Sequence, residues 1–192
     1  PFSPHLLEYS FNGLGVVYAG MPLGGRIDRV DVDAQNRAVV IDYKHRSSVD
    51  EFKLKDPTVA TKAGDIPADD PDWIPQHTQA LIYAQAIKRA LGLDARGALY
   101  FATKGTTQAM RGAVSAELAE EERGDGRVPG LKVGFPDEAE GGSMGFEELL
   151  DRVEAATAKR FERLASGDVA ASPEPQDRCV YNHPIGFERR GA

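Results

Sequence analysis

The chain has 192 residues, of which 41% are hydrophobic and 28% are charged, as in an ordinary globular protein with one sizeable domain. Its formal net charge of -7 argues against a broad nucleic-acid-binding surface, unless the acidic residues gather at a metal site or a larger polypeptide supplies a basic channel. No hydrophobic run approaches the ~20 residues that a membrane-spanning helix requires, so we expect no membrane partner and a cytoplasmic location.

The first part of the chain predicts β-structure. Arg26–Val32 and Ala38–Lys44 both have strand character, and the polar residues 33–37 between them are typical of a turn, so the segment is predicted to form a β-hairpin. Val16–Ala19 is predicted to be another short strand, because glycines mark turns on both sides of it. Residues 46–72 are polar and lack sustained periodicity, which favours a loop.

A helix is predicted over Pro75–Leu91. The segment is rich in helix-forming residues, has a proline suited to the first turn and basic residues near its end, and is followed by Gly92 as a stop signal. Ala98–Thr103 follows as a short apolar strand. The order of hairpin, helix and strand predicts an α/β fold with a mixed central β-sheet flanked by helices.

The remainder of the chain is expected to add one helix to a single domain that covers residues 1–192. Residues 104–142 contain acidic and glycine-rich stretches and are predicted to be an acidic insertion. Hydrophobic residues then recur at helical spacing from Phe146 to Leu164, which predicts an amphipathic helix that ends at Gly167. Residues from about 168 to 192 are expected to form an irregular tail.

The predicted hairpin brings two carboxylates together. Asp28 and Asp42 are equally far along the chain from Gln35, so a hairpin centred on Gln35 places them opposite each other with Cβ atoms ~5 Å apart. Such a pair must extend into water, share a proton or hold a cation. Lys44 is two residues beyond Asp42 and therefore projects from the same face of the sheet.

An oxygen-rich site of this kind suits Mg²⁺ or Mn²⁺, which bind phosphate oxygens, so a phosphodiester is the natural substrate. The metal would activate water, and Lys44 would orient that water or neutralise a phosphate oxygen. An Asp-X-Lys triplet is also common by chance, and charges on an exposed hairpin often serve solubility alone. The triplet by itself therefore leaves a purely structural interpretation open.

Three motifs follow one another along the chain: a G-x-I-D segment at Gly25–Asp28, a D-Y-K segment at Asp42–Lys44, and a Q-x-x-x-Y helix at Gln79–Tyr83. In this order they resemble the motifs of the RecB-like and AddB-like nucleases of the PD-(D/E)XK superfamily. The resemblance implies a restriction-endonuclease-like core. It also implies a Mg²⁺-dependent deoxyribonuclease, with an exonuclease expected rather than an endonuclease, and with Mn²⁺ able to substitute for Mg²⁺.

The same resemblance implies roles for individual residues. Asp28 and Asp42 would be metal ligands, the main-chain carbonyl of Tyr43 would complete the coordination, and Lys44 would be the catalytic lysine. Glu8 resembles an upstream acidic element of the family and would be a further ligand.

Gln79 and Tyr83 lie on one face of their helix, where they can reach the metal site or the DNA backbone. A polar helix face with one half-buried tyrosine is the structural alternative for this pair. With the two motifs before it, the functional role is the one that we predict. Because His5 does not stand on the upstream helix that carries the family's first motif, we interpret it as an ordinary histidine.

The end of the chain resembles the cysteine-rich tail of the family's iron-sulfur members, with departures. Gln176 and Ile185 stand where that pattern has cysteines, so at most one thiolate, that of Cys179, remains. A [4Fe-4S] cluster takes four cysteines, and we therefore expect no iron-sulfur cluster. Cys179 is interpreted as a buried relic, and as a single cysteine it excludes an internal disulfide.

The resemblance implies a module that cuts single-stranded DNA during double-strand-break repair. Because the chain begins with Pro1, we expect it to be a fragment of a larger protein, with a helicase motor in the same polypeptide and a second helicase-nuclease subunit as a further partner. Two alternatives stay open. One is a catalytically silent DNA-binding or scaffold domain of such a complex, and the other is a free-standing nuclease of the same superfamily.

Overall fold

The computed structural model describes residues 1–49, 52, 74–75, 77–104, 110–125 and 145–168, and all structural statements concern these residues. The predicted tail and most of the predicted loop over residues 46–72 lie outside them. None of the described helices is both long and apolar enough to cross a lipid bilayer.

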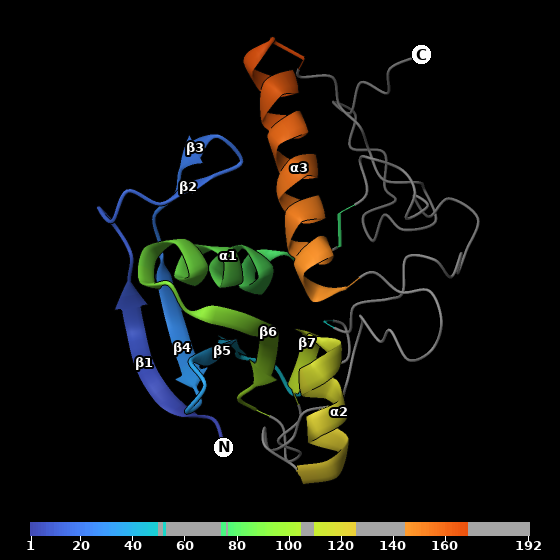
Figure 1. Ribbon diagram of the computed structural model, residues 1–192. Helices are drawn as coiled ribbons and strands as arrows, with labels where there is room; N and C mark the ends of the chain where they lie inside the picture. Colours follow the sequence, from blue (N-terminus) through green and yellow to red (C-terminus); the bar gives the residue numbers. More distant parts are fainter. Residues whose placement is uncertain (50–51, 53–73, 76, 105–109, 126–144, 169–192) are drawn as a thin grey trace, which may run out of the picture.

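A five-stranded mixed sheet forms the centre of the fold, with strand order β1-β4-β5-β6-β7 (Figure 1). Neighbouring strands are antiparallel except for β5 and β6, which are parallel. The strands are β1 (Ser3–Ser10), β4 (Arg26–Val32), β5 (Arg37–Lys44), β6 (Asp94–Ala102) and β7 (Met110–Val114). A separate two-stranded sheet contains β2 (Val17–Tyr18) and β3 (Met21–Pro22). The predicted α/β class with a mixed central sheet is confirmed.

Helices cover both faces of the sheet, and each face has its own hydrophobic core (Figure 1). On one face α1 (Gln79–Leu91) and α3 (Phe146–Ala165) pack against each other and against side chains such as Val40 and Ala98. On the other face α2 (Ala116–Asp125) packs Leu118 against Val39. Alternate residues of the central strands are buried on opposite faces, as the period of a β-strand requires.

The hairpin of β4 and β5 has the predicted register. Val30 pairs with Val40, so the turn is centred on Gln35. The carboxylate of Asp33 closes the turn, because Oδ1 accepts hydrogen bonds from the backbone N–H groups of Gln35 (2.9 Å) and Arg37 (3.0 Å). This side-chain contact within the turn sets the loop length and with it the pairing of the two strands.

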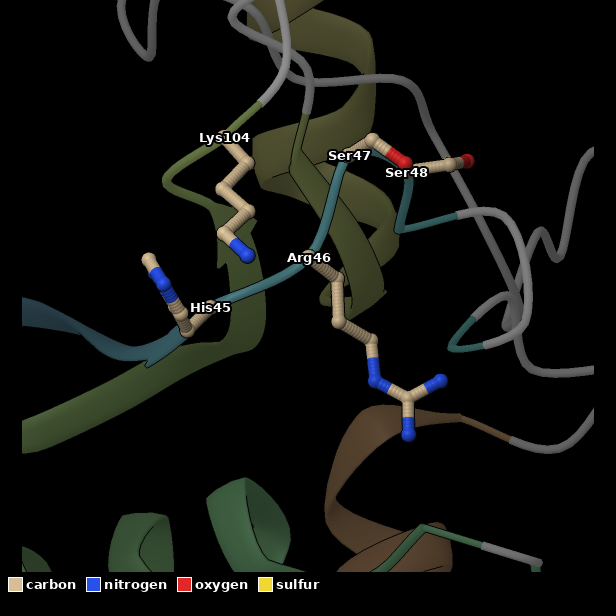
Figure 2. Close-up of a pocket in the computed structure, with 5 residues that line it drawn as sticks. All are labelled: His45, Arg46, Ser47, Ser48 and Lys104. Atoms are coloured by element: carbon tan, nitrogen blue, oxygen red, sulfur yellow. The ribbon is translucent and has the colours of Figure 1, made fainter.

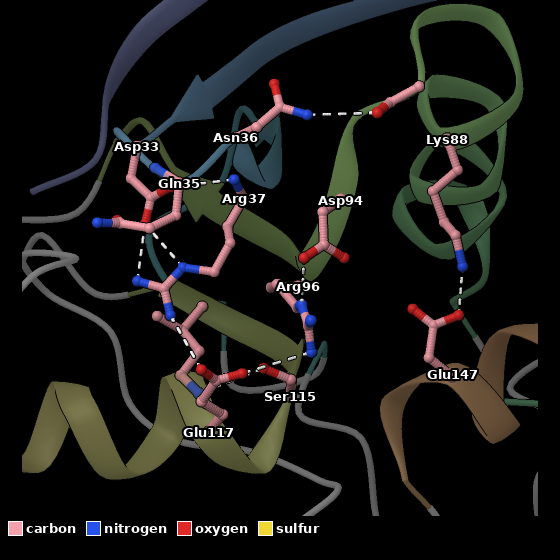
Figure 3. Close-up of polar contacts among 12 residues, drawn as sticks. Asp33, Gln35, Asn36, Arg37, Lys88, Asp94, Arg96, Ser115, Glu117 and Glu147 are labelled. Atoms are coloured by element: carbon pink, nitrogen blue, oxygen red, sulfur yellow. Dashed lines mark hydrogen bonds and ion pairs between the residues drawn. The ribbon is translucent and has the colours of Figure 1, made fainter.

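Arg37 joins the hairpin turn to α2 through a group of ion pairs (Figure 3). Its guanidinium donates to Asp33 Oδ2 (2.8 Å) and to both carboxylate oxygens of Glu121 (2.9 Å each). Glu117 lies 3.5 Å away, and the guanidinium also stands over the ring of Phe2. Only 8% of the Arg37 side chain and 1% of the Asp33 side chain are exposed, so the contact between these two is shielded from water, whereas the Glu121 side chain is 27% exposed.

Two predicted element starts differ from the structure. β6 begins at Asp94 and not at Ala98. The helix begins at Gln79, with Thr78 as its N-cap, and not at Pro75. The ring of His77 packs against Phe52 at 4.4 Å between centroids, and this tertiary contact keeps the preceding chain off the helical path. Gly92 ends the helix as predicted, in the left-handed conformation and with its N–H bonded to the carbonyl of Lys88.

Four elements were not predicted from the sequence: β1, β3, β7 and α2. The last two lie inside residues 104–142, which were expected to be an insertion, yet Met110, Val114 and Leu118 are buried core residues. β1 is an edge strand whose burial does not alternate, so it lacks the period-two pattern of a half-buried strand. Strand pairing and packing, more than local pattern, define these elements.

Gly112 of β7 is required by a close approach between strands. A Cβ atom at this position would lie 2.1 Å from the carbonyl oxygen of Ala98, and its φ of +148° is rarely adopted by other residues. We expect Gly112→Ala to lower the free energy of unfolding by about 3 kcal/mol, measured by chemical denaturation. Gly13→Ala is the matched control, because a Cβ at that position meets no described heavy atom within 4 Å. Its expected cost is about 1 kcal/mol, and equal costs for the two variants would contradict the prediction.

Candidate functional site

The predicted site lies where β4 and β5 diverge. Their pairing runs from the turn to Arg29 and Ile41. Beyond that pair, β4 continues against β1 and β5 continues against β6, so each strand has a different neighbour. Asp28 and Asp42 are the next residues along the two strands. The carboxylates therefore stand at a fork in the sheet, where backbone pairing no longer fills the space between the strands.

Asp28 takes over one of the backbone contacts that is lost at the fork. Its Oδ2 accepts a hydrogen bond of 2.8 Å from the backbone N–H of Tyr43 on β5. This contact satisfies a donor that would otherwise need a partner and holds the Asp28 carboxylate beside β5. The charge of Asp28 in turn contributes, after burial, to a raised pKa of Asp42.

Asp42 is a buried carboxylate with an unsatisfied oxygen. Only 4% of the residue is exposed, and burial is the main cause of its raised pKa, ahead of the repulsion from Asp28. Lys44 Nζ lies 2.6 Å from Asp42 Oδ2, which opposes that rise. Apart from this ion pair, Oδ2 has no hydrogen-bond partner among the described residues. An oxygen of this kind, beside a second carboxylate, suits a divalent cation.

Lys44 connects the two carboxylates to the start of α1. It follows Asp42 at the interval that puts both on one face of β5, and its Nζ donates to Gln79 Oε1 at 2.9 Å. Gln79 Nε2 donates in turn to the hydroxyl of Tyr83 at 3.2 Å. The structure thus brings together Asp28, Asp42, Lys44, Gln79 and Tyr83, which come from three separate segments of the sequence.

Tyr100 is part of this site and was not predicted from the sequence. It pairs with Asp42 across the parallel strands, and its ring centroid lies 5.5 Å from Lys44 Nζ. Its hydroxyl accepts a hydrogen bond of 3.2 Å from the backbone N–H of Ala80, in the first turn of α1. Burial, and to a lesser degree the charge of Asp42, raises the pKa of Tyr100 to about 12. No pattern in the sequence indicated this role, because the pairing of β6 with β5 places Tyr100 opposite Asp42.

The glycine of the first motif has a packing role beside the site. A Cβ atom on Gly25 would lie 2.9 Å from the Phe11 ring and 3.4 Å from the Tyr83 ring. Those two rings meet edge to face at 5.7 Å between centroids. A side chain at Gly25 would therefore displace the Phe11 ring, against which Tyr83 packs.

Two other predicted ligands are placed differently from the carboxylate pair. Glu8 has a positive φ of 49°, its side chain is 65% exposed, and its carboxylate lies 3.7 Å from Arg26. The Tyr43 side chain packs edge to face with Phe101, so the site can use only its main chain. Within the described part of the chain, no group of three or more His, Cys, Asp or Glu side chains is arranged to hold a metal ion.

Four other residues were discussed from the sequence: one histidine on β1 and three residues near the end of the chain. His5 is exposed on β1, as suits an ordinary surface histidine. Gln176, Cys179 and Ile185 lie outside the described residues, so the expected absence of an iron-sulfur cluster stays a prediction.

Comparison with known families identifies one match of nearly the whole chain. The family model described as PD-(D/E)XK nuclease superfamily matches residues 1–183. The matched range includes β1, the hairpin, α1 and every residue of the site described above. No curated protein matches the chain.

Proposed function

The chain belongs to the PD-(D/E)XK nuclease superfamily, and we propose that it is a divalent-metal-dependent deoxyribonuclease that hydrolyses phosphodiester bonds. The observation that carries this proposal is the buried carboxylate of Asp42 beside Asp28, with Lys44 as the single cation against its Oδ2 among the described residues. Two carboxylates and one ammonium leave a net negative charge in a partly buried place, which a divalent cation would offset. Membership of the superfamily supplies the reaction that such a cation would serve.

We propose Asp28, Asp42 and the main-chain carbonyl of Tyr43 as the ligands of Mg²⁺, with Mn²⁺ as a substitute. All three are oxygen donors, which both ions prefer. Glu8 is a further candidate ligand, although its carboxylate contacts Arg26 and is well exposed. When bound, a divalent ion supplies Lewis-acid chemistry for phosphodiester hydrolysis.

Lys44 supplies the positive charge of the site itself. Its Nζ is positioned by Asp42 on one side and by Gln79 on the other. From there it can neutralise a non-bridging phosphate oxygen or orient a water molecule for attack. Tyr100 adds a buried aromatic surface against the lysine, which excludes water from one side and keeps the ammonium in place.

Gln79 is proposed to position Lys44 through its side-chain oxygen. Gln79→Ala is expected to reduce kcat for DNA cleavage by about ten- to a hundred-fold, because it removes a hydrogen bond to a charged donor, while KM changes little. Tyr83→Phe keeps the ring contact with Phe11 and removes only the bond to Gln79 Nε2, so its expected loss is smaller. Equal losses in the two variants, or an unchanged kcat in Gln79→Ala, would contradict this role.

Within the superfamily, we propose that the chain is the nuclease module of a RecB-like or AddB-like helicase-nuclease acting on single-stranded DNA in double-strand-break repair. The order of the G-x-I-D, D-Y-K and Q-x-x-x-Y motifs supports this placement. The net charge of -7 is compatible with it if a helicase motor in the same polypeptide and a second subunit provide the basic DNA path.

A catalytically silent DNA-binding or scaffold domain is the second candidate. One observation favours it: the described residues contain no third carboxylate grouped with Asp28 and Asp42. A site with few protein ligands can bind Mg²⁺ weakly, and in that case the chain would bind DNA without cutting it.

A cleavage assay decides between the two candidates. Linear and circular single-stranded DNA and linear duplex DNA are incubated with the full chain in Mg²⁺, in Mn²⁺ and in EDTA. We expect cleavage of linear single strands in both metals and none in EDTA. Failure to cut any substrate in either metal would support the silent domain, whereas cutting of the circle would replace the expected exonuclease by an endonuclease.

A further inference from the structure

A second feature of the surface adjoins the proposed site. A cavity of about 510 Å³ lies at the end of β5 and β6, immediately after Lys44 (Figure 2). Its lining residues are His45, Arg46, Ser47, Ser48 and Lys104. In Figure 2, Lys104 and His45 extend from the two strand ends toward the same space, and the two serines stand on the next part of the chain.

Main-chain hydrogen bonds hold the two segments that form this cavity. The carbonyl of Lys44 accepts hydrogen bonds from the backbone N–H groups of Arg46 (2.7 Å) and Thr103 (3.0 Å). The carbonyl of Arg46 accepts one from the backbone N–H of Lys104 (3.0 Å). His45 Nδ1 and Thr103 Oγ1 lie 3.2 Å apart. The cavity is therefore formed before any ligand arrives, which lowers the entropic cost of binding.

The charge of the lining differs from that of the rest of the protein. The chain carries a net charge of -7, yet none of the described residues that line this cavity has a carboxylate. A second cavity, of about 380 Å³ near the hairpin turn, shows the contrast, because Asp94, Glu117 and Glu121 line it. The lining contains two basic side chains, Arg46 and Lys104, and two serine hydroxyls. Side chains of these kinds bind the phosphate groups of nucleic acids.

We propose that the cavity formed by residues 45–48 and Lys104 binds a backbone phosphate of the DNA strand that is cut, next to the phosphate at Lys44. This inference rests on the proposed nuclease function. The spacing supports it, since the Cα atoms of Lys44 and Arg46 can be at most about 7 Å apart. A strand that presents one phosphate to Lys44 therefore passes the cavity with its neighbouring phosphate, and the contact fixes the strand without reading its sequence.

Binding of labelled DNA in the absence of metal tests the proposal. The full chain is titrated into fluorescein-labelled oligo(dT) of about 20 nucleotides in EDTA, and anisotropy is recorded at several salt concentrations. We expect Lys104→Ala to weaken binding several-fold and to reduce the slope of log K against log salt by about 0.7, the value for one lost phosphate contact on a single strand.

Arg163→Ala is the matched control. It also removes one positive charge, but from the far end of α3, where Arg163 is paired with Asp168. Its affinity and salt slope should stay within about two-fold of the parent. Thermal melting of each variant confirms folding, and Lys104→Gln repeats the test without the cavity that alanine leaves. Slopes that match the parent in both Lys104 variants would overturn the proposal.

Two further arms identify the source of the phosphate. Oligonucleotides with a 5′-phosphate and with a 5′-hydroxyl should bind the parent equally and lose the same affinity in Lys104→Ala. An effect confined to the 5′-phosphorylated strand would mean that the cavity takes a strand end, which overturns the assignment to a backbone phosphate. Inorganic phosphate at millimolar concentration should compete only weakly, and complete displacement of the DNA by it would also overturn the assignment.

The outcome is separate from that of the proposed activity, because the binding measurements contain no metal. A parent that shows the expected slopes and fails to cut DNA in Mn²⁺ would remove the nuclease proposal and keep the phosphate site. A parent that cuts DNA while the Lys104 variants keep the parental slope would keep the nuclease proposal and remove the phosphate site.

Discussion

Asp42→Asn is expected to reduce metal-dependent DNA cleavage by about a thousand-fold, equivalent to roughly 4 kcal/mol of lost transition-state stabilisation. The amide has nearly the same shape as the carboxylate but cannot provide its charge to a divalent ion. The loss is measured as kcat/KM on labelled single-stranded DNA in saturating Mn²⁺. Asp94→Asn is the control: it removes one carboxylate at the start of β6, at the end of the strand away from Tyr100 and Asp42, and should leave the rate unchanged.

Folding stability separates a ligand from a structural residue in the same variant. Asp42 is buried, its pKa is raised by that burial, and its Oδ2 has no hydrogen-bond partner among the described residues. The charged group therefore opposes folding when no cation is bound, and Asp42→Asn should melt in EDTA at the same temperature as the parent or higher. Mn²⁺ should raise the melting temperature of the parent and not that of the variant.

Lys44→Met completes this comparison. Loss of a catalytic cation should affect cleavage alone, whereas loss of a metal ligand should affect both cleavage and the stabilisation by Mn²⁺. We expect the variant to lose cleavage to a similar extent but to keep the stabilisation by Mn²⁺, since the carboxylates remain. Stabilisation by Mn²⁺ that persists in Asp42→Asn, or that disappears only in Lys44→Met, would contradict the assignment of roles.

Arg37→Met is expected to lower the free energy of unfolding by about 3 kcal/mol at neutral pH. The substitution keeps much of the hydrophobic stem and leaves the Asp33 carboxylate, whose side chain is 1% exposed, without its guanidinium partner. It also disconnects the hairpin turn from Glu121 on α2. Chemical denaturation measures this loss of unfolding free energy. The loss should appear although Asp28 and Asp42 at the fork of the sheet are not substituted.

Arg96→Met is the matched control for this loss. Arg96 belongs to the same charged cluster and pairs with Asp94 at 2.9 Å, but 32% of its side chain is exposed (Figure 3). Partly exposed ion pairs contribute about 0–1 kcal/mol, so the expected cost is below 1 kcal/mol. A cost for Arg96→Met as large as that for Arg37→Met would show that burial is not the source of the effect.

The stability difference between Arg37→Met and the parent should also depend on pH. Burial alone would raise the pKa of Asp33, but hydrogen bonds from the Arg37 side chain and from the backbone of Arg37 and Gln35 outweigh it and lower the pKa below 3.8. An acid whose pKa is lower in the folded protein than in the unfolded chain stabilises the fold at pH values above its ordinary pKa. This contribution is lost as the pH falls through the pKa of the folded state. The difference should therefore be full at pH 7 and shrink below pH 3.8.

The register of the hairpin could be predicted because its causes are local. The alternation of the two strands and the chemistry of the turn around Gln35 both lie within Arg26–Lys44, and the structure has the expected pairing of Val30 with Val40. The side of the sheet that carries Asp28, Asp42 and Lys44 follows from that pairing and the period of a strand. The start of α1 was wrong by one turn, because a packing contact of His77 decides it.

The opening of the ladder at the site could not be predicted, because it depends on which strands lie on either side. β4 separates from β5 but stays paired with β1, an edge strand without alternation. β5 stays paired with β6, whose other neighbour β7 lies in a stretch that resembles an insertion. The same long-range pairing places Tyr100 beside Asp42. No local pattern contains this information.

By itself, the sequence determined the hairpin, the spacing of the carboxylates about its turn, and the motif order that predicts a nuclease, since these depend on residues close together in the chain. The tertiary structure decided three things: the burial of Asp42, the position of Gln79 against Lys44, and the cavity next to them. Each of these joins segments that are far apart in sequence. The physical reason is that burial and charge interactions depend on distance in space, which only the pairing of all five strands and the packing of the helices establish.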